Sequence, residues 1–302
     1  MSFTIATTID EALAALAAGA RPIAGGTDLV VGARHGKAPL PDDLVAIDRI
    51  EQLAQVELHG DGATIGPMVS HADLMTDPII AGSYTAIADA AALVGSPSTR
   101  HLGTIGGNVM NGSPAMDTGA PLLVLGARAE LRHHTSASSG NRFVELGDLW
   151  TGPGQTSATD DELLVALHLP PAQERCGSAY VRLEYRRAME IAVVGAAAGV
   201  TLAEDGTIAS AAVALAAVAP TILAVDGAND ALAGQTLATA GPIIAQLAAA
   251  QAAPISDLRA SDTYRRHCIG VMAKRALDAA ARRAGGEAIA VPVNRSIGIG
   301  AA

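Results

Sequence analysis

Two pairs of adjacent glycines are the residues whose type and spacing best suit ligand chemistry in this sequence. They lie in the segments Ala24-Gly25-Gly26-Thr27-Asp28-Leu29 and Gly103-Thr104-Ile105-Gly106-Gly107-Asn108. Because glycine lacks a Cβ, the chain can approach a ligand closely and adopt positive φ, so that successive N–H groups surround an oxyanion without any lysine. Each pair could instead make only a tight turn. The spacing alone does not name a ligand.

Other classes of site and partner are disfavoured by motif and composition. Neither glycine segment matches GxGxxG or GxxxxGK[ST], which argues against a Rossmann domain and a nucleotide triphosphatase. The net charge of -10 and the pI near 5.2 argue against nucleic-acid and anionic-membrane partners. Cys176 and Cys268 are the only cysteines and form no CxxC motif, so we expect no disulfide framework and no iron-sulfur or zinc site within this chain.

The elements that must position the glycines follow a mixed pattern of helices and strands. Thr8 and Glu11 form a capping box that opens a helix, and a strand over 21–24 then leads into the first glycine segment. The remaining elements expected before residue 170 are strands at 44–47, 56–58, 63–65 and 162–169, helices over 71–80 and 84–95, and a helix passing into a strand over 120–134. The fold class is therefore α+β.

The proline pair Pro170-Pro171 predicts a domain boundary. Beyond it we expect three long strands, over 178–186, 191–202 and 208–218, and helices near 241–252 and 261–284. Residues 206–225 carry no charge over the length of a membrane span, but their alanines and Pro220 favour a buried strand. Residues 286–302 have no helical period and predict an exposed tail. The N-terminus lacks the pattern of a signal peptide, and a cytoplasmic location is expected.

Four stretches of the sequence together resemble one known family. They are PIAGGTDLVV, GSPSTRHLGTIGGNVMNGSPAMDTGAPLLVLGA, YVRLEYRRAMEIAVVGAAAG and DLRASDTYRRHCIGVMAKRAL. In this order they resemble landmarks of the flavoprotein (medium) subunit of carbon monoxide dehydrogenase and xanthine dehydrogenase type enzymes, the molybdenum hydroxylases. The resemblance covers roughly residues 1–284, and the TIGGN loop followed by SPAMD is its most specific part.

The resemblance implies an architecture and a cofactor site. The expected fold is a two-subdomain FAD-binding fold of the vanillyl-alcohol-oxidase (PCMH) type over 1–170, divided at about residue 55, then a smaller domain over 175–285 with a three-stranded antiparallel sheet and helices. The segments 24–29 and 103–108 are expected to hold the FAD diphosphate. Further expected FAD contacts are Asn111, Asp117, Leu164 beside the isoalloxazine, and Arg182 where some relatives have a lysine. A planar guanidinium keeps the charge of that lysine but changes its hydrogen-bond geometry.

The function implied by the resemblance is electron transfer through noncovalent FAD, with no catalytic acid, base or nucleophile in this chain. Molybdopterin and [2Fe-2S] clusters are expected only in partner subunits, a large one and a small one respectively, assembled as a dimer of heterotrimers. An external acceptor takes the electrons. Two alternatives are a self-sufficient FAD oxidase or dehydrogenase and an FAD-free assembly protein of the same fold. No residue beside the first glycine pair offers the His or Cys of a covalent flavin link.

Overall fold

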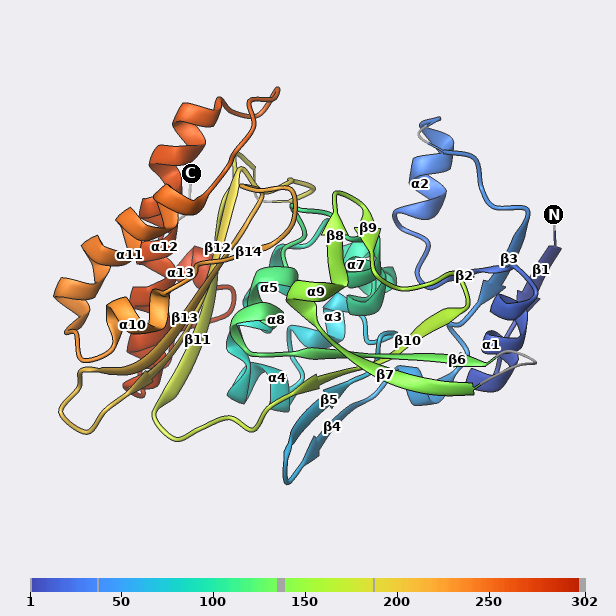
Figure 1. Ribbon diagram of the computed structural model, residues 1–302, viewed down its shortest axis with the longest axis horizontal. Helices are drawn as coiled ribbons and strands as arrows, with labels where there is room; N and C mark the ends of the chain where they lie inside the picture. Colours follow the sequence, from blue (N-terminus) through green and yellow to red (C-terminus); the bar gives the residue numbers. More distant parts are fainter. Residues whose placement is uncertain (1, 37, 135–138, 187, 299–302) are drawn as a thin grey trace.

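Three sheets lie in a row along the long axis of the molecule (Figure 1), and a fourth, two-stranded sheet forms a small hairpin. The computed structural model describes residues 2–36, 38–134, 139–186 and 188–298. Helices and strands are mixed along the chain, which confirms the predicted α+β class.

The N-terminal sheet is parallel, with strand order β1-β3-β2. The elements of this unit are β1 (Ser2–Ile5), α1 (Ile9–Ala17), β2 (Arg21–Ile23), α2 (Leu29–Arg34), β3 (Asp43–Ala46) and the 3₁₀ turn η1 (Glu51–Leu53). The predicted capping box is present, because the Glu11 N–H donates to Thr8 Oγ1 over 3.2 Å and the Thr7 N–H donates to the Glu11 carboxylate over 2.7 Å. It fixes the start of α1 and so the connection that leads to β2.

The central sheet has five antiparallel strands in the order β4-β5-β10-β6-β7. Its unit contains β4 (Val56–His59), β5 (Gly62–Ile65), α3 (His71–Leu74), α4 (Pro78–Ser83), α5 (Thr85–Leu93), α6 (Pro97–Leu102), α7 (Ile105–Asn111), α8 (Gly119–Val124), β6 (Arg128–His134), β7 (Ser139–Glu145), α9 (Leu146–Leu149), β8 (Trp150–Gly152), β9 (Gln155–Thr156) and β10 (Glu162–Leu169). Helices α5 and α8 lie between this sheet and the C-terminal one (Figure 1).

Strand β10 is buried on both faces, which explains its nearly continuous apolar sequence. Leu163 and Val165 belong to the core of the N-terminal unit, whereas Leu164 and Leu167 belong to the core of the central unit. The register against β6 shifts between Leu164 and Ala166. One strand therefore joins two cores.

The C-terminal sheet is antiparallel, with strand order β11-β12-β13-β14. Its unit contains β11 (Cys176–Leu183), β12 (Val194–Leu202), β13 (Ile208–Ala216), β14 (Leu223–Ala224), α10 (Ala228–Leu232), α11 (Leu237–Gln251), α12 (Asp262–Ala284) and α13 (Val293–Ser296). The three long strands are as predicted, and β14 adds a short fourth strand. The uncharged stretch 206–225 contains the buried strand β13, and no described helix is long and apolar enough to cross a membrane.

The segment after α12 corrects one expectation. We expected residues 286–302 to form an exposed tail without helical structure, but residues 293–296 form α13, and the side chains of Val293 and Asn294 are fully buried. Helix α13 packs against β11. A single turn is too short for a helical period to show in the sequence, and the burial depends on a strand more than a hundred residues away. Residues 299–302 lie outside the described part of the chain.

Candidate functional site

The first glycine segment is the loop between β2 and α2. Gly26 has φ +68°, a left-handed conformation that a residue with a Cβ rarely adopts. The backbone N–H groups of Gly25, Gly26, Thr27 and Asp28 donate to no described residue. An amide without a protein partner must be satisfied by water or a ligand. This loop therefore offers several donors to an oxyanion.

The two glycine segments touch each other, although nearly eighty residues separate them in the sequence. A Cβ added to Gly25 would lie 1.6 Å from the carbonyl oxygen of Leu102, directly before the second segment. A Cβ added to Gly103 would lie 3.5 Å from Oγ1 of Thr27. Gly25 is thus required because the two backbones are in contact, which places both segments at one site.

The second glycine segment differs from the first because its amides are already bonded. It joins α6 to α7: Gly103 ends α6, and Thr104 caps α7 by accepting from the Gly107 N–H over 3.1 Å. The N–H groups of Gly103, Ile105, Gly106 and Asn108 donate to backbone carbonyls at 2.7–3.0 Å. A Cβ on Gly106 would lie 2.3 Å from the Cβ of Pro67, whereas one on Gly107 would meet only Thr104 Oγ1, at 3.1 Å. Gly106 is packed inside, and Gly107 is exposed.

A buried histidine lies beside the meeting point of the two segments. His71 is 2% exposed, and its Cδ2 lies 3.4 Å from the position of a Cβ on Gly103. Its Nδ1 has no hydrogen-bond partner among the described residues. Burial and, to a smaller extent, the charge of Arg100 lower the pKa of His71 to about 4, so the imidazole is neutral at pH 7. Sequence reasoning missed this residue, because an isolated histidine carries no motif.

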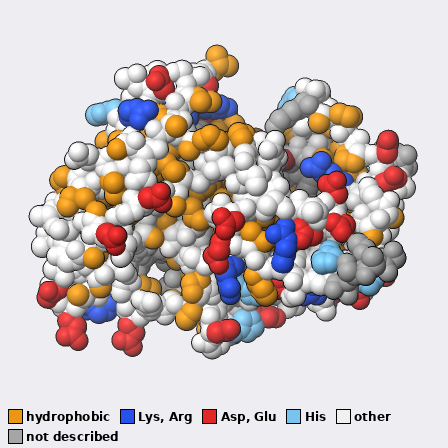
Figure 2. Space-filling model, in the orientation of Figure 1, with side chains coloured by type: hydrophobic (Ala, Val, Ile, Leu, Met, Phe, Trp, Pro, Cys, Tyr) orange, Lys and Arg blue, Asp and Glu red, His pale blue; other side chains and the backbone are white. Residues whose placement is uncertain are grey.

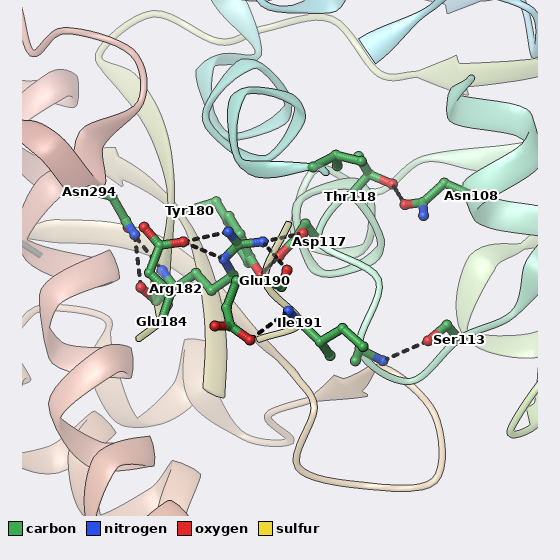
Figure 3. Close-up of polar contacts among 12 residues, drawn as sticks. Asn108, Ser113, Asp117, Thr118, Tyr180, Arg182, Glu184, Glu190, Ile191 and Asn294 are labelled. Atoms are coloured by element: carbon green, nitrogen blue, oxygen red, sulfur yellow. Dashed lines mark hydrogen bonds and ion pairs between the residues drawn. The ribbon is translucent and has the colours of Figure 1, made fainter. Parts of the chain in front are cut away.

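Asp117 and Arg182, predicted separately, meet in one buried cluster (Figure 3). A guanidinium nitrogen of Arg182 lies 2.8 Å from one carboxylate oxygen of Asp117, and Tyr180 Oη donates to the other over 2.7 Å. Arg182 also donates to Glu184, which directly follows the end of β11. Although burial alone would lower the pKa of Arg182, the Asp117 and Glu184 carboxylates raise it above its ordinary value. Both oxygens of Asp117 are therefore engaged inside the protein.

The remaining predicted residues lie in different surroundings. Asn108, on α7, accepts a hydrogen bond from the Thr118 hydroxyl over 2.6 Å. Asn111, at the end of α7, is exposed. Leu164 is packed in the core of the central unit. The structure thus brings the two loops together and joins Asp117 to Arg182. The FAD contacts expected of all these residues stay predictions.

The surface is hollowed between α2 and the region of α7 and β8 (Figure 2), and the first glycine loop leads directly into α2. Two other cavities, of about 300 and 340 Å³, lie between α8 and the C-terminal sheet and share Val124, Ala211 and Asn229 in their walls. Neither is lined by a glycine loop residue. We therefore take the hollow beside α2 as the candidate site.

Comparison with known proteins identifies the family of this chain. Residues 1–172 match the family described as FAD binding domain in molybdopterin dehydrogenase, and residues 179–280 match the CO dehydrogenase flavoprotein C-terminal domain. The chain belongs to the molybdopterin dehydrogenase flavoprotein family. The predicted cofactor, FAD, and the predicted oxidoreductase class are thereby confirmed for this flavoprotein.

Relatives resemble this flavoprotein over nearly their whole length. It is 33% identical over 295 residues to a putative xanthine dehydrogenase FAD-binding subunit of Escherichia coli K12, covering 95% of this chain and 98% of that one. It is 34% identical over 266 residues to the carbon monoxide dehydrogenase medium chain of Afipia carboxidovorans, covering 88% and 90%. A solved structure of reconstituted CO dehydrogenase from Oligotropha carboxidovorans matches with a TM-score of 0.87 at 32% identity, covering 94% of this chain and 98% of the other. The predicted two-part fold is confirmed.

The described residues fit FAD. The free amides of the first loop suit a diphosphate, which carries negative charge but needs no lysine when several N–H groups converge on it. The contact at Gly25 leaves no room for a side chain between the loops, and the unpaired Nδ1 of His71 supplies one more polar group beside them. Backbone donors and a neutral imidazole are consistent with an anionic ligand on a protein of net charge -10.

Proposed function

We propose that this flavoprotein is the electron-transfer subunit of a multi-subunit molybdenum hydroxylase. Electrons arrive from iron-sulfur clusters of a partner subunit and leave to an external acceptor through noncovalently bound FAD. The observation that carries the proposal is the convergence of the two glycine segments at Gly25 and Leu102, since it brings together the two segments that the family resemblance expects to hold the FAD diphosphate. The flavin supplies the redox chemistry when bound.

The residues of this chain bind and orient the cofactor in this proposal. The amides of Gly25 to Asp28 hold the diphosphate, and the exposed Gly107 lets the second loop approach it. Asn108 and Asn111 face the same region from α7 in the proposed site, and Leu164 provides an apolar wall near the ring system. Asp117 and Arg182 act together, as a fixed pair that connects β11 to the loop before α8.

Partner subunits are the second part of the proposal. The two cysteines are far apart in the sequence, and among the described residues no group of His, Cys, Asp and Glu could hold a metal. The relatives named above are subunits or chains of dehydrogenases. We propose a large molybdopterin subunit and a small iron-sulfur subunit, assembled as a dimer of heterotrimers in the cytoplasm. We also propose domains at 1–170 and 175–285, on either side of the connection between β10 and β11.

An absorption spectrum of the purified full chain, taken before and after acid precipitation, tests the cofactor proposal. Flavin bands with FAD in the supernatant are expected. Flavin that stays with the precipitate would contradict noncovalent binding, and a colourless protein that also fails to bind added FAD would favour the assembly-protein alternative. Turnover of a purine or an aldehyde by the chain alone would favour a self-sufficient enzyme.

The partner proposal has its own test. The tagged chain is purified from its native host, and the copurifying chains are analysed for molybdenum and iron. Two partners of unequal size, one carrying molybdenum and one carrying iron, are expected. A chain that purifies alone with full turnover would contradict the division of labour.

A further inference from the structure

Strand β11 is an edge strand whose outer backbone groups are satisfied by side chains. It pairs with β12 on one side only. On its free side the Tyr180 N–H donates to the Asp89 carboxylate over 3.2 Å, and the Ser178 carbonyl accepts from Thr85 and Arg283 at 2.6 and 2.8 Å. Side chains of α5 and α12 thus replace a neighbouring strand.

Asn294 completes this row at the end of β11 that carries Arg182. Its Oδ1 accepts from the Arg182 N–H over 2.9 Å, and its Nδ2 donates to the Arg182 carbonyl over 2.8 Å (Figure 3). The Asn294 side chain is fully buried, and the neighbouring Val293 N–H donates to Asp89 over 2.8 Å. One amide side chain therefore fixes both backbone groups of a single residue, as a β-bridge does.

A continuous set of contacts leads from that residue to the second glycine segment. Arg182 holds Asp117 at 2.8 Å, and the next residue, Thr118, donates to Asn108 over 2.6 Å. Asn108 lies on α7, whose first turn contains the second glycine pair. Figure 3 shows these side chains following one another across the junction between the C-terminal and central units.

We propose that Asn294 is a positioning residue of the flavin site, which acts through Arg182 and Asp117 on the orientation of Asn108. This inference depends on the proposed function, because it assigns the C-terminal segment a part in holding FAD. The whole path is buried or nearly so, and close-packed interiors transmit displacement instead of absorbing it. An Arg182 backbone released from Asn294 would shift the guanidinium, and Asp117 has no second cation within the cluster to replace it.

The experiment compares Asn294→Ala with Ser296→Ala in the full chain. Ser296 lies on the same turn, but it is exposed, and among the described residues its hydroxyl donates to the Ala290 carbonyl alone, over 3.2 Å. We expect Asn294→Ala to bind FAD about tenfold more weakly, a change equivalent to one or two hydrogen bonds, and to shift the flavin absorption bands, with no change for Ser296→Ala. Unaltered FAD affinity and spectrum in folded Asn294→Ala would overturn the proposal.

A double-mutant cycle separates positioning from simple loss of stability. Asn294→Ala and Asn108→Ala are combined, and FAD affinity is measured at a temperature where all variants are folded. If Asn294 acts through Asn108, the double variant loses little more affinity than Asn108→Ala alone, whereas independent effects multiply. If Asn294→Ala does not fold, Asn294→Ser takes its place in the cycle. Wild-type chain that binds no FAD refutes the proposed function, while additive effects in a chain that binds FAD refute only this inference.

Discussion

The two glycine segments share a dipeptide but use it for opposite purposes. In the first, the amides of Gly25 to Asp28 are free of described partners, and in the second the amides from Gly103 onward are largely bonded within the protein. The second segment is therefore a fixed support, and the first is the part that offers donors to a ligand. A glycine pair in a sequence therefore predicts that another group lies close to the backbone. It does not predict whether that group belongs to a ligand or to the protein.

Gly25→Ala should produce the largest effect, because it forces the two segments apart. A Cβ 1.6 Å from the Leu102 carbonyl oxygen cannot be accommodated without moving backbone. We expect FAD affinity to fall about a hundredfold, as when two or three hydrogen bonds are lost, and the free energy of unfolding to fall by about 3 kcal/mol. Urea titration and FAD titration measure the two. Gly32→Ala on α2, with no atom within 4 Å, is the matched control, and equal behaviour of the two variants would contradict the contact between the loops.

Gly106→Ala tests the claim that the second segment is a support. Its Cβ would lie 2.3 Å from the Pro67 Cβ and 2.7 Å from the Pro67 carbonyl oxygen, both farther than the 1.6 Å at Gly25, so the backbone needs a smaller shift. We expect a loss of about 2 kcal/mol in the free energy of unfolding, measured by urea titration. The loss should be the same with and without FAD. A variant as stable as wild type would show that Gly106 is not packed against Pro67.

His71 makes the meeting point of the loops sensitive to pH. Its folded pKa of about 4 lies below the unfolded value near 6.5, so the unfolded chain binds the proton more readily. The free energy of unfolding is therefore unaffected by protonation of His71 above about pH 7. It decreases as the pH falls through 6.5 and stops changing below about 4. At pH 5 the loss should be about 2 kcal/mol. Urea unfolding at pH 7.5 and 5 should show a larger decrease for wild type than for His71→Gln, and parallel decreases would exclude His71 as the source.

Gly107→Ala should have the smallest effect on stability and is the most specific probe of FAD. The added Cβ meets only Thr104 Oγ1, at 3.1 Å, and Gly107 is exposed. We expect the free energy of unfolding to change by less than about 0.5 kcal/mol, while FAD binds about tenfold more weakly. Calorimetry and FAD titration distinguish the two quantities. Unchanged FAD affinity would mean that the second segment serves only as a support.

The sequence predicts those parts of the molecule whose structure depends on residues close together in the chain. Thr8 and Glu11 predict a helix start within four residues, and the long apolar stretches separated by turns after residue 175 predict three strands. The family resemblance supplied the fold and FAD, and both were confirmed. Helix α2 was not foreseen, because its six residues follow the glycine loop without a side-chain cap.

The parts that were missed depend on contacts between distant residues. Asn294 bonds Arg182 from 112 positions away, and nothing in the sequence around Pro292 marks it as buried. His71 owes its low pKa to the elements packed over it and not to its neighbours in the chain. Asp117 was predicted to contact FAD, but its two internal hydrogen-bond partners, Tyr180 and Arg182, come from a different sheet. Such pairings appear only when the chain is folded.

The buried carboxylate of Asp89 has a consequence for the way this chain is synthesised. Besides the Tyr180 N–H, its partners are the Arg283 guanidinium at 2.6 Å, 194 residues further along, and the Val293 N–H. Because translation delivers the N-terminal region first, helix α5 exists on the ribosome long before either partner does. In the folded protein burial raises the pKa of Asp89, while the Arg283 guanidinium and the Val293 N–H oppose that rise, so these partners are needed to bury the ionised carboxylate. Residues 283 and 293 lie beyond both family-matched regions, so a segment that neither match covers holds the buried carboxylate of the first region.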